Sequence, residues 1–221
     1  MSTRAGVALM SYQIKPLLKL YSLACASVLL SSVSSCGVPA DGDSVGELRG
    51  TVLEVPILKP DLVLTDTEGG LYDLRAETDG YLSLVFFGYT NCPDVCPVHM
   101  ATLAGVFDEL APEVRDATKV IFVSTDPERD TPDRLRQWLR AYHPSFLGLS
   151  GEMEAINAAL AEMKLPGVAV VPGQHGSEVT IGHPSAVLAF GRDGLARVRY
   201  PFGVRRADWV NDLPLLLSEN P

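Results

Sequence analysis

Cysteine is scarce in this chain. The 221 residues contain four, at positions 25, 36, 92 and 96. Cys25 and Cys36 lie in an N-terminal segment that has the features of a removable leader. The mature protein would then contain one pair, Cys92 and Cys96, and thiol chemistry is confined to that pair.

Basic side chains are also in deficit. The chain carries 18 lysines and arginines against 27 acidic residues, a formal net charge of -9. Removal of residues 1–36, which hold three basic residues and no acidic one, leaves 15 basic against 27 acidic residues, a net charge of -12. A body this acidic is a poor binder of nucleic acid, because the phosphate backbone repels it.

Internal repeats, low-complexity blocks and signs of a second domain are absent from the sequence. At 221 residues, of which 47% are hydrophobic and 20% charged, the chain suits one globular domain with a full core. No nucleophile is accompanied by a general base on a helix, which argues against a hydrolase. The cysteine pair is therefore the feature on which a functional hypothesis depends.

The first 36 residues predict export. A basic region ends at Lys19, and about 16 apolar or small residues follow, the length of a signal-peptide hydrophobic region. The run ends in small residues before Cys36, which resembles a bacterial lipoprotein cleavage site with lipidation at Cys36. An uncleaved anchor and an ordinary signal peptide are the alternatives, although the run is short for a bilayer span of about 20 residues. All three place the body outside the cytoplasm, and we expect it to be membrane-tethered in the bacterial cell envelope, facing the periplasm.

Strand and helix patterns alternate along the rest of the chain. Residues 37–50 are polar and glycine-rich and predict a flexible tether, so that the domain spans 51–221. Apolar runs at 81–87 and 119–124 are typical of strands buried on both faces. The expected order is two short strands, a strand, a helix, a strand, two helices, two strands and a last helix.

This order is the thioredoxin-like arrangement. We predict an α/β thioredoxin-like fold with a central mixed sheet flanked by helices and an extra N-terminal hairpin at 62–74. A second hairpin is expected around 191–194, and Pro214 would kink or split the last helix. Asp130 or Thr131 can cap the helix that follows the second buried strand.

The segment FFGYTNCPDVCP, residues 86–97, holds both cysteines at the end of a strand. A loop from a strand into a helix lies at the C-terminal edge of the sheet, where ligands gather. Pro97 suits a first helical turn, so Cys96 would lie at a helix N-terminus, where free N–H groups and the helix dipole favour its thiolate. With Cys92 on the loop, the sulfurs can approach one another, and both a redox disulfide and a shared metal ion are geometrically open.

Two thiolates rarely complete a metal site, and four histidines are candidates for a third ligand. His183 stands just before the strand expected at 186–190, and in a thioredoxin-like fold the loop entering that strand packs against the cysteine loop. His99 follows the second cysteine by three residues but lies a turn along the helix. His143 is expected to be structural or solvent-facing, and His175 to lie in an exposed loop. His183 is therefore the best-placed third ligand.

These motifs together resemble the Sco/SenC family. FFGYTNCPDVCP is followed by STDPERDTP at 124–132 and by a late histidine before a strand, and the resemblance covers roughly residues 62–217. It implies a membrane-tethered, thioredoxin-like copper protein that helps to assemble the CuA centre of cytochrome c oxidase. Cys92 and Cys96 match the two sulfur ligands of the family, and His183 matches its distal histidine ligand.

Two positions beside His183 depart from the pattern of the family. The family usually has an aspartate before this histidine and a serine or threonine after it, whereas this chain has Gly182 and Pro184. A carboxylate that would orient the imidazole is therefore missing from its usual place. Pro184 is also similar to the proline that faces the cysteines in ordinary thioredoxins, which points to a redox role.

The leading hypothesis is a copper metallochaperone, not an enzyme, that holds copper on Cys92, Cys96 and His183. Two thiolates and an imidazole suit Cu(I), and a Cu(II) form could recruit water or a nearby oxygen, for which Asp126 is the next residue to test. Zn²⁺ would accept the same ligands, so the resemblance, not the donor set, selects copper.

The resemblance implies cytochrome c oxidase subunit II or another cuproprotein as the recipient, with other copper chaperones as further partners and the membrane as the site of attachment. Two alternatives stay open. One is a thiol–disulfide reductase that acts on partner cysteines, with copper secondary. The other is a redox or copper sensor that signals through the disulfide state of Cys92 and Cys96.

Overall fold

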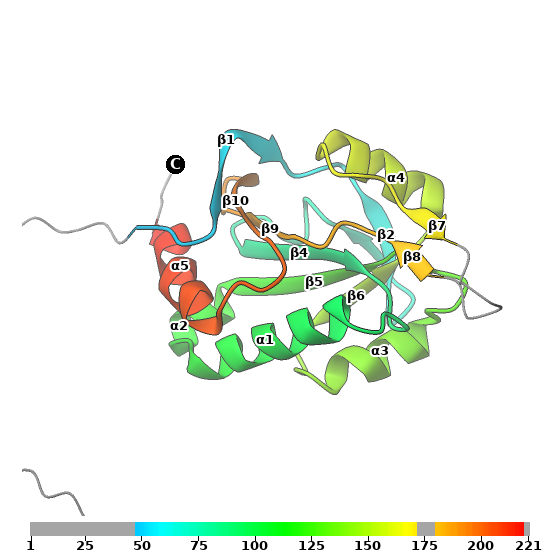
Figure 1. Ribbon diagram of the computed structural model, residues 1–221, viewed down its shortest axis with the longest axis horizontal. Coiled ribbons are helices and arrows are strands. Elements are labelled where there is room, and N and C mark those ends of the chain that lie inside the picture. Colours follow the sequence, from blue (N-terminus) through cyan, green and yellow to red (C-terminus); the bar gives the residue numbers. More distant parts are fainter. Residues whose placement is uncertain (1–46, 172–179, 219–221) are drawn as a thin grey trace, which may run out of the picture. The chain divides into compact units, whose positions relative to one another are not determined.

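The computed structural model describes residues 47–171 and 180–218 (Figure 1). The predicted leader with Cys25 and Cys36, most of the predicted tether, and His175 lie outside the described residues. The strands are β1 (Thr51–Leu58), β2 (Val63–Asp66), β3 (Leu71–Asp73), β4 (Leu82–Gly88), β5 (Thr118–Ser124), β6 (Leu147–Ser150), β7 (Ala169–Val171), β8 (Thr180–Gly182), β9 (Val187–Phe190) and β10 (Leu195–Tyr200), and the helices are α1 (Val95–Glu109), α2 (Pro112–Asp116), α3 (Pro132–Arg140), α4 (Met153–Glu162) and α5 (Arg206–Ser218).

A mixed sheet organises this part of the chain, with the strand order β1-β10-β9-β4-β5-β6-β2-β3. β4 lies between β5, which is parallel to it, and β9, which is antiparallel to it. In chain order, β4, α1, β5, α3, β9, β10 and α5 form the thioredoxin-like core, so the predicted fold is confirmed. β2 and β3 pair as the predicted extra hairpin at one end of the sheet.

Both faces of the central strands are buried, which explains their continuous apolar runs. Phe86 of β4 and Phe122 of β5 pack in a cluster with side chains of α1, α3 and α5. Val85 and Phe87, which point to the other face, pack with α4. Figure 1 shows α1 and α3 on one side of the sheet and α4 on the other. Full burial of one such side chain stabilises the fold by roughly 1.5–3 kcal/mol. The end of β4 is therefore held firmly in place by the core.

Some elements differ from the sequence-based expectation. β1, β6, the β7–β8 hairpin and the short helix α2 were not expected. α3 begins at Pro132 and is capped by Thr131, whose hydroxyl accepts a hydrogen bond from the N–H of Arg134 at 3.4 Å, whereas Asp130 has another role. α5 runs on through Pro214, so of the two expected effects of this proline, a kink or a split, the split does not occur.

Candidate metal centre

Three side chains from two separate parts of the chain, the segment from the end of β4 to the start of α1 and the loop before β9, meet at the edge of the sheet where β4 ends. Sγ of Cys92, Sγ of Cys96 and Nε2 of His183 all lie within 4.8 Å of one another. Nε2 of His183 is 3.5 Å from Sγ of Cys96 and 4.0 Å from Sγ of Cys92. The structure therefore brings together the three side chains that the sequence singled out.

Strand pairing explains why the two loops meet. The cysteine loop leaves β4 after Gly88, and β9 runs antiparallel to β4, so the loop that enters β9 lies at the same edge. Gly88 itself permits the close approach of the second sulfur, because a Cβ atom there would lie only 2.6 Å from Sγ of Cys96. The glycine of the FFGYT segment thus has a direct role in seating the cysteine pair.

The two cysteines differ in charge. Cys92 is partly exposed, whereas Cys96 is fully buried. Hydrogen bonds, first from the Cys96 thiol and then from the backbone N–H groups of Cys96 and Asp94, outweigh the effect of burial and together lower the pKa of Cys92 to about 4. The same hydrogen bond, together with burial, raises the pKa of Cys96 well above its ordinary value. At neutral pH the pair therefore carries one negative charge, and that charge lies on Cys92.

This distribution corrects the prediction that the helix start favours the thiolate of Cys96. Cys96 is the second residue of α1, and its backbone N–H points at the sulfur of Cys92, 3.5 Å away. The free N–H groups of the first helical turn therefore stabilise charge on the cysteine that precedes the helix. Burial within the core opposes charge on the cysteine inside it.

The tautomer of His183 follows from its hydrogen bond. Nδ1 of His183 lies 2.9 Å from the carbonyl oxygen of Pro184. Because a carbonyl only accepts, Nδ1 carries a proton, and in the neutral imidazole Nε2, which is directed at the two sulfurs, is then the nitrogen that can bind a metal ion. The rings of Tyr89 and Phe86 meet the imidazole edge-on, at centroid distances of 5.6 and 5.8 Å.

This donor set fits a soft metal ion. It offers one thiolate, one thiol whose proton a metal would displace, and one imidazole lone pair, all aimed into one small space. Sulfur and imidazole donors of this kind suit Cu(I), and they also suit Zn²⁺. The residues present therefore fit copper.

The other predicted candidates do not join the cluster. His99 is buried on α1, and its Nε2 lies 2.9 Å from the carbonyl oxygen of Ser185. His143 packs against the rings of Phe107 and Phe146, at centroid distances of 5.2 and 5.1 Å, in a structural setting as expected. Among the described residues, the sulfur–imidazole group contains neither of these histidines and no carboxylate.

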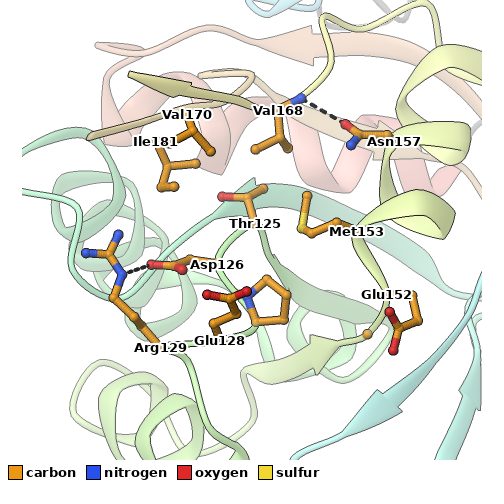
Figure 2. Close-up of a pocket in the computed structure, with 12 residues that line it drawn as sticks. Thr125, Asp126, Glu128, Arg129, Glu152, Met153, Asn157, Val168, Val170 and Ile181 are labelled. Carbon is orange, nitrogen blue, oxygen red and sulfur yellow. Dashed lines mark hydrogen bonds and ion pairs between the residues drawn. The ribbon is translucent and has the colours of Figure 1, made fainter. Parts of the chain in front are cut away.

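A pocket of about 800 Å³ is lined by residues that include Asp126, Arg129 and Ile181. Figure 2 shows Asp126 on one side of it, paired with the guanidinium of Arg129. Ile181 lies on another wall, and its backbone is hydrogen-bonded to the hydroxyl of Tyr89, whose ring packs against His183. Asp126 pairs with Arg129 and is not part of the sulfur–imidazole group, so its role at the site stays a prediction.

Asp130 has a role that the sequence did not reveal. It is 1% exposed, and its carboxylate accepts hydrogen bonds from the Thr90 N–H at 3.1 Å, the Thr90 hydroxyl at 2.5 Å and the Ser124 hydroxyl at 2.7 Å. Nε of Arg134 donates to the same Thr90 hydroxyl at 2.8 Å. Since Thr90 lies two residues before Cys92, the STDPERDTP stretch anchors the loop that carries the first cysteine.

The sequence matches known proteins over most of its length. The pattern of the family described as SCO1/SenC matches residues 53–217. An SCO2-like protein of Rickettsia felis is 35% identical over 105 residues, which cover 48% of this chain and 50% of that protein. The chain spans about half the length of the curated relatives it matches first.

Solved structures give the same result for the fold. The structure of Bradyrhizobium japonicum ScoI with copper bound is 29% identical, with a TM-score of 0.64, and the match covers 72% of this chain and 99% of that one. The apo Sco1 protein from Thermus thermophilus is 32% identical, with a TM-score of 0.67 and coverage of 79% and 99%. Because the similar ScoI structure has copper bound, we identify the group of Cys92, Cys96 and His183 as a candidate copper site.

The charge on the cysteine pair can be measured directly. We predict that thiolate absorbance at 240 nm in the reduced protein titrates with a midpoint near pH 4, because the pKa of Cys92 is lowered to about 4. Brief alkylation at mildly acidic pH, followed by peptide mass mapping, should label Cys92 and spare Cys96. A midpoint near the ordinary thiol value of 9.0, or labelling of Cys96 first, would contradict this charge distribution.

The anchoring role of Asp130 gives a second prediction. Asp130→Ala removes the acceptor for three donors and should lower the free energy of unfolding by about 2–4 kcal/mol. The matched control is Asp133→Ala, whose side chain is 76% exposed and pairs only at the surface with Arg136, with an expected change within about 0.5 kcal/mol. Urea unfolding measures the change in the free energy of unfolding for each variant. Equal changes in the two variants would show that Asp130 does not anchor the cysteine loop.

Proposed function

The chain belongs to the SCO1/SenC family, and from that premise we propose that it is a copper metallochaperone of the cell envelope. It holds copper, its cargo, on Cys92, Cys96 and His183 and delivers it to, or matures, the CuA site of cytochrome c oxidase. The observation that carries this proposal is the convergence of two sulfurs and one free imidazole nitrogen within 4.8 Å of one another. Copper-bound ScoI of Bradyrhizobium japonicum supports the choice of copper over zinc.

The exposure of the two sulfurs suits transfer as well as binding. Cys96 is buried, whereas Cys92 is partly exposed at the edge of the sheet. A thiolate of a recipient protein therefore approaches the copper from the side of Cys92. Exchange of one sulfur ligand at a time keeps the soft ion coordinated throughout, which favours passage between proteins over release into water.

A second function is favoured by one specific observation, the lowered pKa of Cys92. A partly exposed thiolate beside a buried thiol is the arrangement of a thiol–disulfide reductase. The Cys92 thiolate would attack a disulfide of a partner and form a mixed disulfide. Cys96 would then lose its proton and attack Sγ of Cys92, which leaves the partner with two thiols and this chain with a Cys92–Cys96 disulfide.

Copper binding separates these two functions. We predict that the reduced protein retains about one Cu(I) after desalting, as expected of a single three-donor site, and that Cys92→Ala and Cys96→Ala lose it. His183→Ala should bind copper more weakly with an altered Cu(II) spectrum, and the control His143→Ala should behave as the parent protein. Failure of the parent to retain copper, with rapid reduction of a partner disulfide, would favour the reductase.

A deletion strain tests the assembly role. Normal oxidase activity at low copper in that strain would contradict the assembly role and favour a sensor.

Attachment to the membrane belongs to the proposal as well. Within the described ranges, no helix is long and apolar enough to cross a membrane. We place the anchor at Cys36, in line with the lipoprotein-like sequence before it. The mass of the mature protein tests this: an N-terminus at Cys36 with attached acyl chains supports it, and an unmodified N-terminus or an intact leader contradicts it.

A further inference from the structure

In this chain, the imidazole of His183 is not oriented by the neighbouring aspartate that the family pattern implies. Gly182 stands where the resemblance implies an aspartate, so no carboxylate is available at that position to hold the imidazole. The side chain must nevertheless aim Nε2 at two sulfurs that come from a different part of the chain. The contacts around the loop of residues 183–185, here called the His183 loop, show what does this.

The hydrogen bond of His183 itself is local. Nδ1 donates to the carbonyl of Pro184, the next residue, at 2.9 Å. This bond selects the tautomer with a free Nε2 and fixes the ring relative to its own backbone. Because donor and acceptor both belong to the His183 loop, it does not fix the loop relative to the cysteines.

His99 supplies the missing link between the loop and the cysteines. Its Nε2 lies 2.9 Å from the carbonyl oxygen of Ser185, and because a carbonyl only accepts, His99 is the donor. His99 and Cys96 lie on the same helix, α1, one turn apart. The bond therefore joins the His183 loop to the helix that carries the second sulfur.

The surroundings of His99 keep this bond in a defined place. His99 is 4% exposed, and its ring packs against Phe86 at 4.8 Å and Phe202 at 5.6 Å between centroids. Phe86 also contacts the ring of His183, at 5.8 Å. The two histidines thus share one aromatic neighbour, Phe86, and the His99 side chain that donates the bond is itself buried.

We propose that His99 is a positioning residue, which clamps the His183 loop onto α1 so that Nε2 of His183 faces both sulfurs. His99 is not itself a ligand, because its Nε2 donates to Ser185 and the side chain lies outside the sulfur–imidazole cluster. The inference rests on the proposed copper site and deepens it. Its consequence is that His99 affects copper only through His183.

A double-mutant cycle tests that consequence. His99→Leu fills similar space without a donor, and His99→Gln keeps an N–H at similar reach. Competition for Cu(I) with a chromophoric chelator should show about tenfold weaker binding for His99→Leu, the usual loss when a group that orients a ligand is removed, and recovery in His99→Gln. In a His183→Ala background, His99→Leu should change nothing further. His143→Leu, at a histidine that also packs between aromatic rings, is the control and should bind as the parent does.

A measurement without metal distinguishes this inference from the proposed function. In the reduced, copper-free protein, the NOE spectrum of the His183 ring should show contacts with the rings of Tyr89 and Phe86 in the parent and in His99→Gln, because the ring centroids lie 5.6 and 5.8 Å from that of His183. In His99→Leu these contacts should weaken, because the His183 loop is no longer held onto α1. If His99→Leu does not fold, the comparison of His99→Gln with His99→Asn, whose amide is too short to reach Ser185, replaces it.

Three results would overturn the inference. One is parental copper affinity in His99→Leu together with weaker binding in His183→Ala. Another is an equal loss from His99→Leu with and without His183. The third is an unchanged His183 ring spectrum in His99→Leu. If the parent protein binds no copper, the proposed function fails, and the ring spectrum still decides whether His99 positions His183.

Discussion

The placement of β4 between a parallel and an antiparallel neighbour is the constraint on which the site depends. β5 runs with β4 and β9 runs against it, so the loops leaving β4 and β5 and the loop entering β9 all meet at one edge of the sheet. Those loops carry Cys92, Asp130 and His183, which are far apart in sequence, and Cys96 lies at the start of the helix α1 that follows the first loop. The side chains of β4 are buried on both faces, and the packed core therefore holds this edge in place.

The two sulfurs at this edge of the sheet differ in their charge and in their exposure to solvent. The start of α1 directs an N–H at Cys92, which is partly exposed and carries the thiolate. Cys96 is buried and protonated, and Gly88 gives its sulfur room. The same division suits ligand exchange and disulfide exchange, so the pair alone does not separate a chaperone from a reductase. The free Nε2 of His183 is the feature that favours metal.

The central strands and the long helices could be predicted from the sequence, because burial on both faces gives a continuous apolar run and burial on one face gives a helical period. β6, β7 and β8 have only three or four residues each, too few for a period to show, and β1 exposes most of its side chains. The three candidate ligands followed from a motif and a topology. The location of the thiolate did not, because it depends on which sulfur is buried and where an N–H points. The role of Asp130 depends on a contact with Thr90, forty residues away, which spacing along the chain does not show.

The central claim is that the imidazole of His183 completes a copper site begun by two cysteines. X-ray absorption spectroscopy of the Cu(I)-loaded protein tests it most directly. The account predicts scattering from two sulfurs and one imidazole nitrogen, and loss of the imidazole signal in His183→Ala. A spectrum with sulfur neighbours alone, unchanged in His183→Ala, would contradict it.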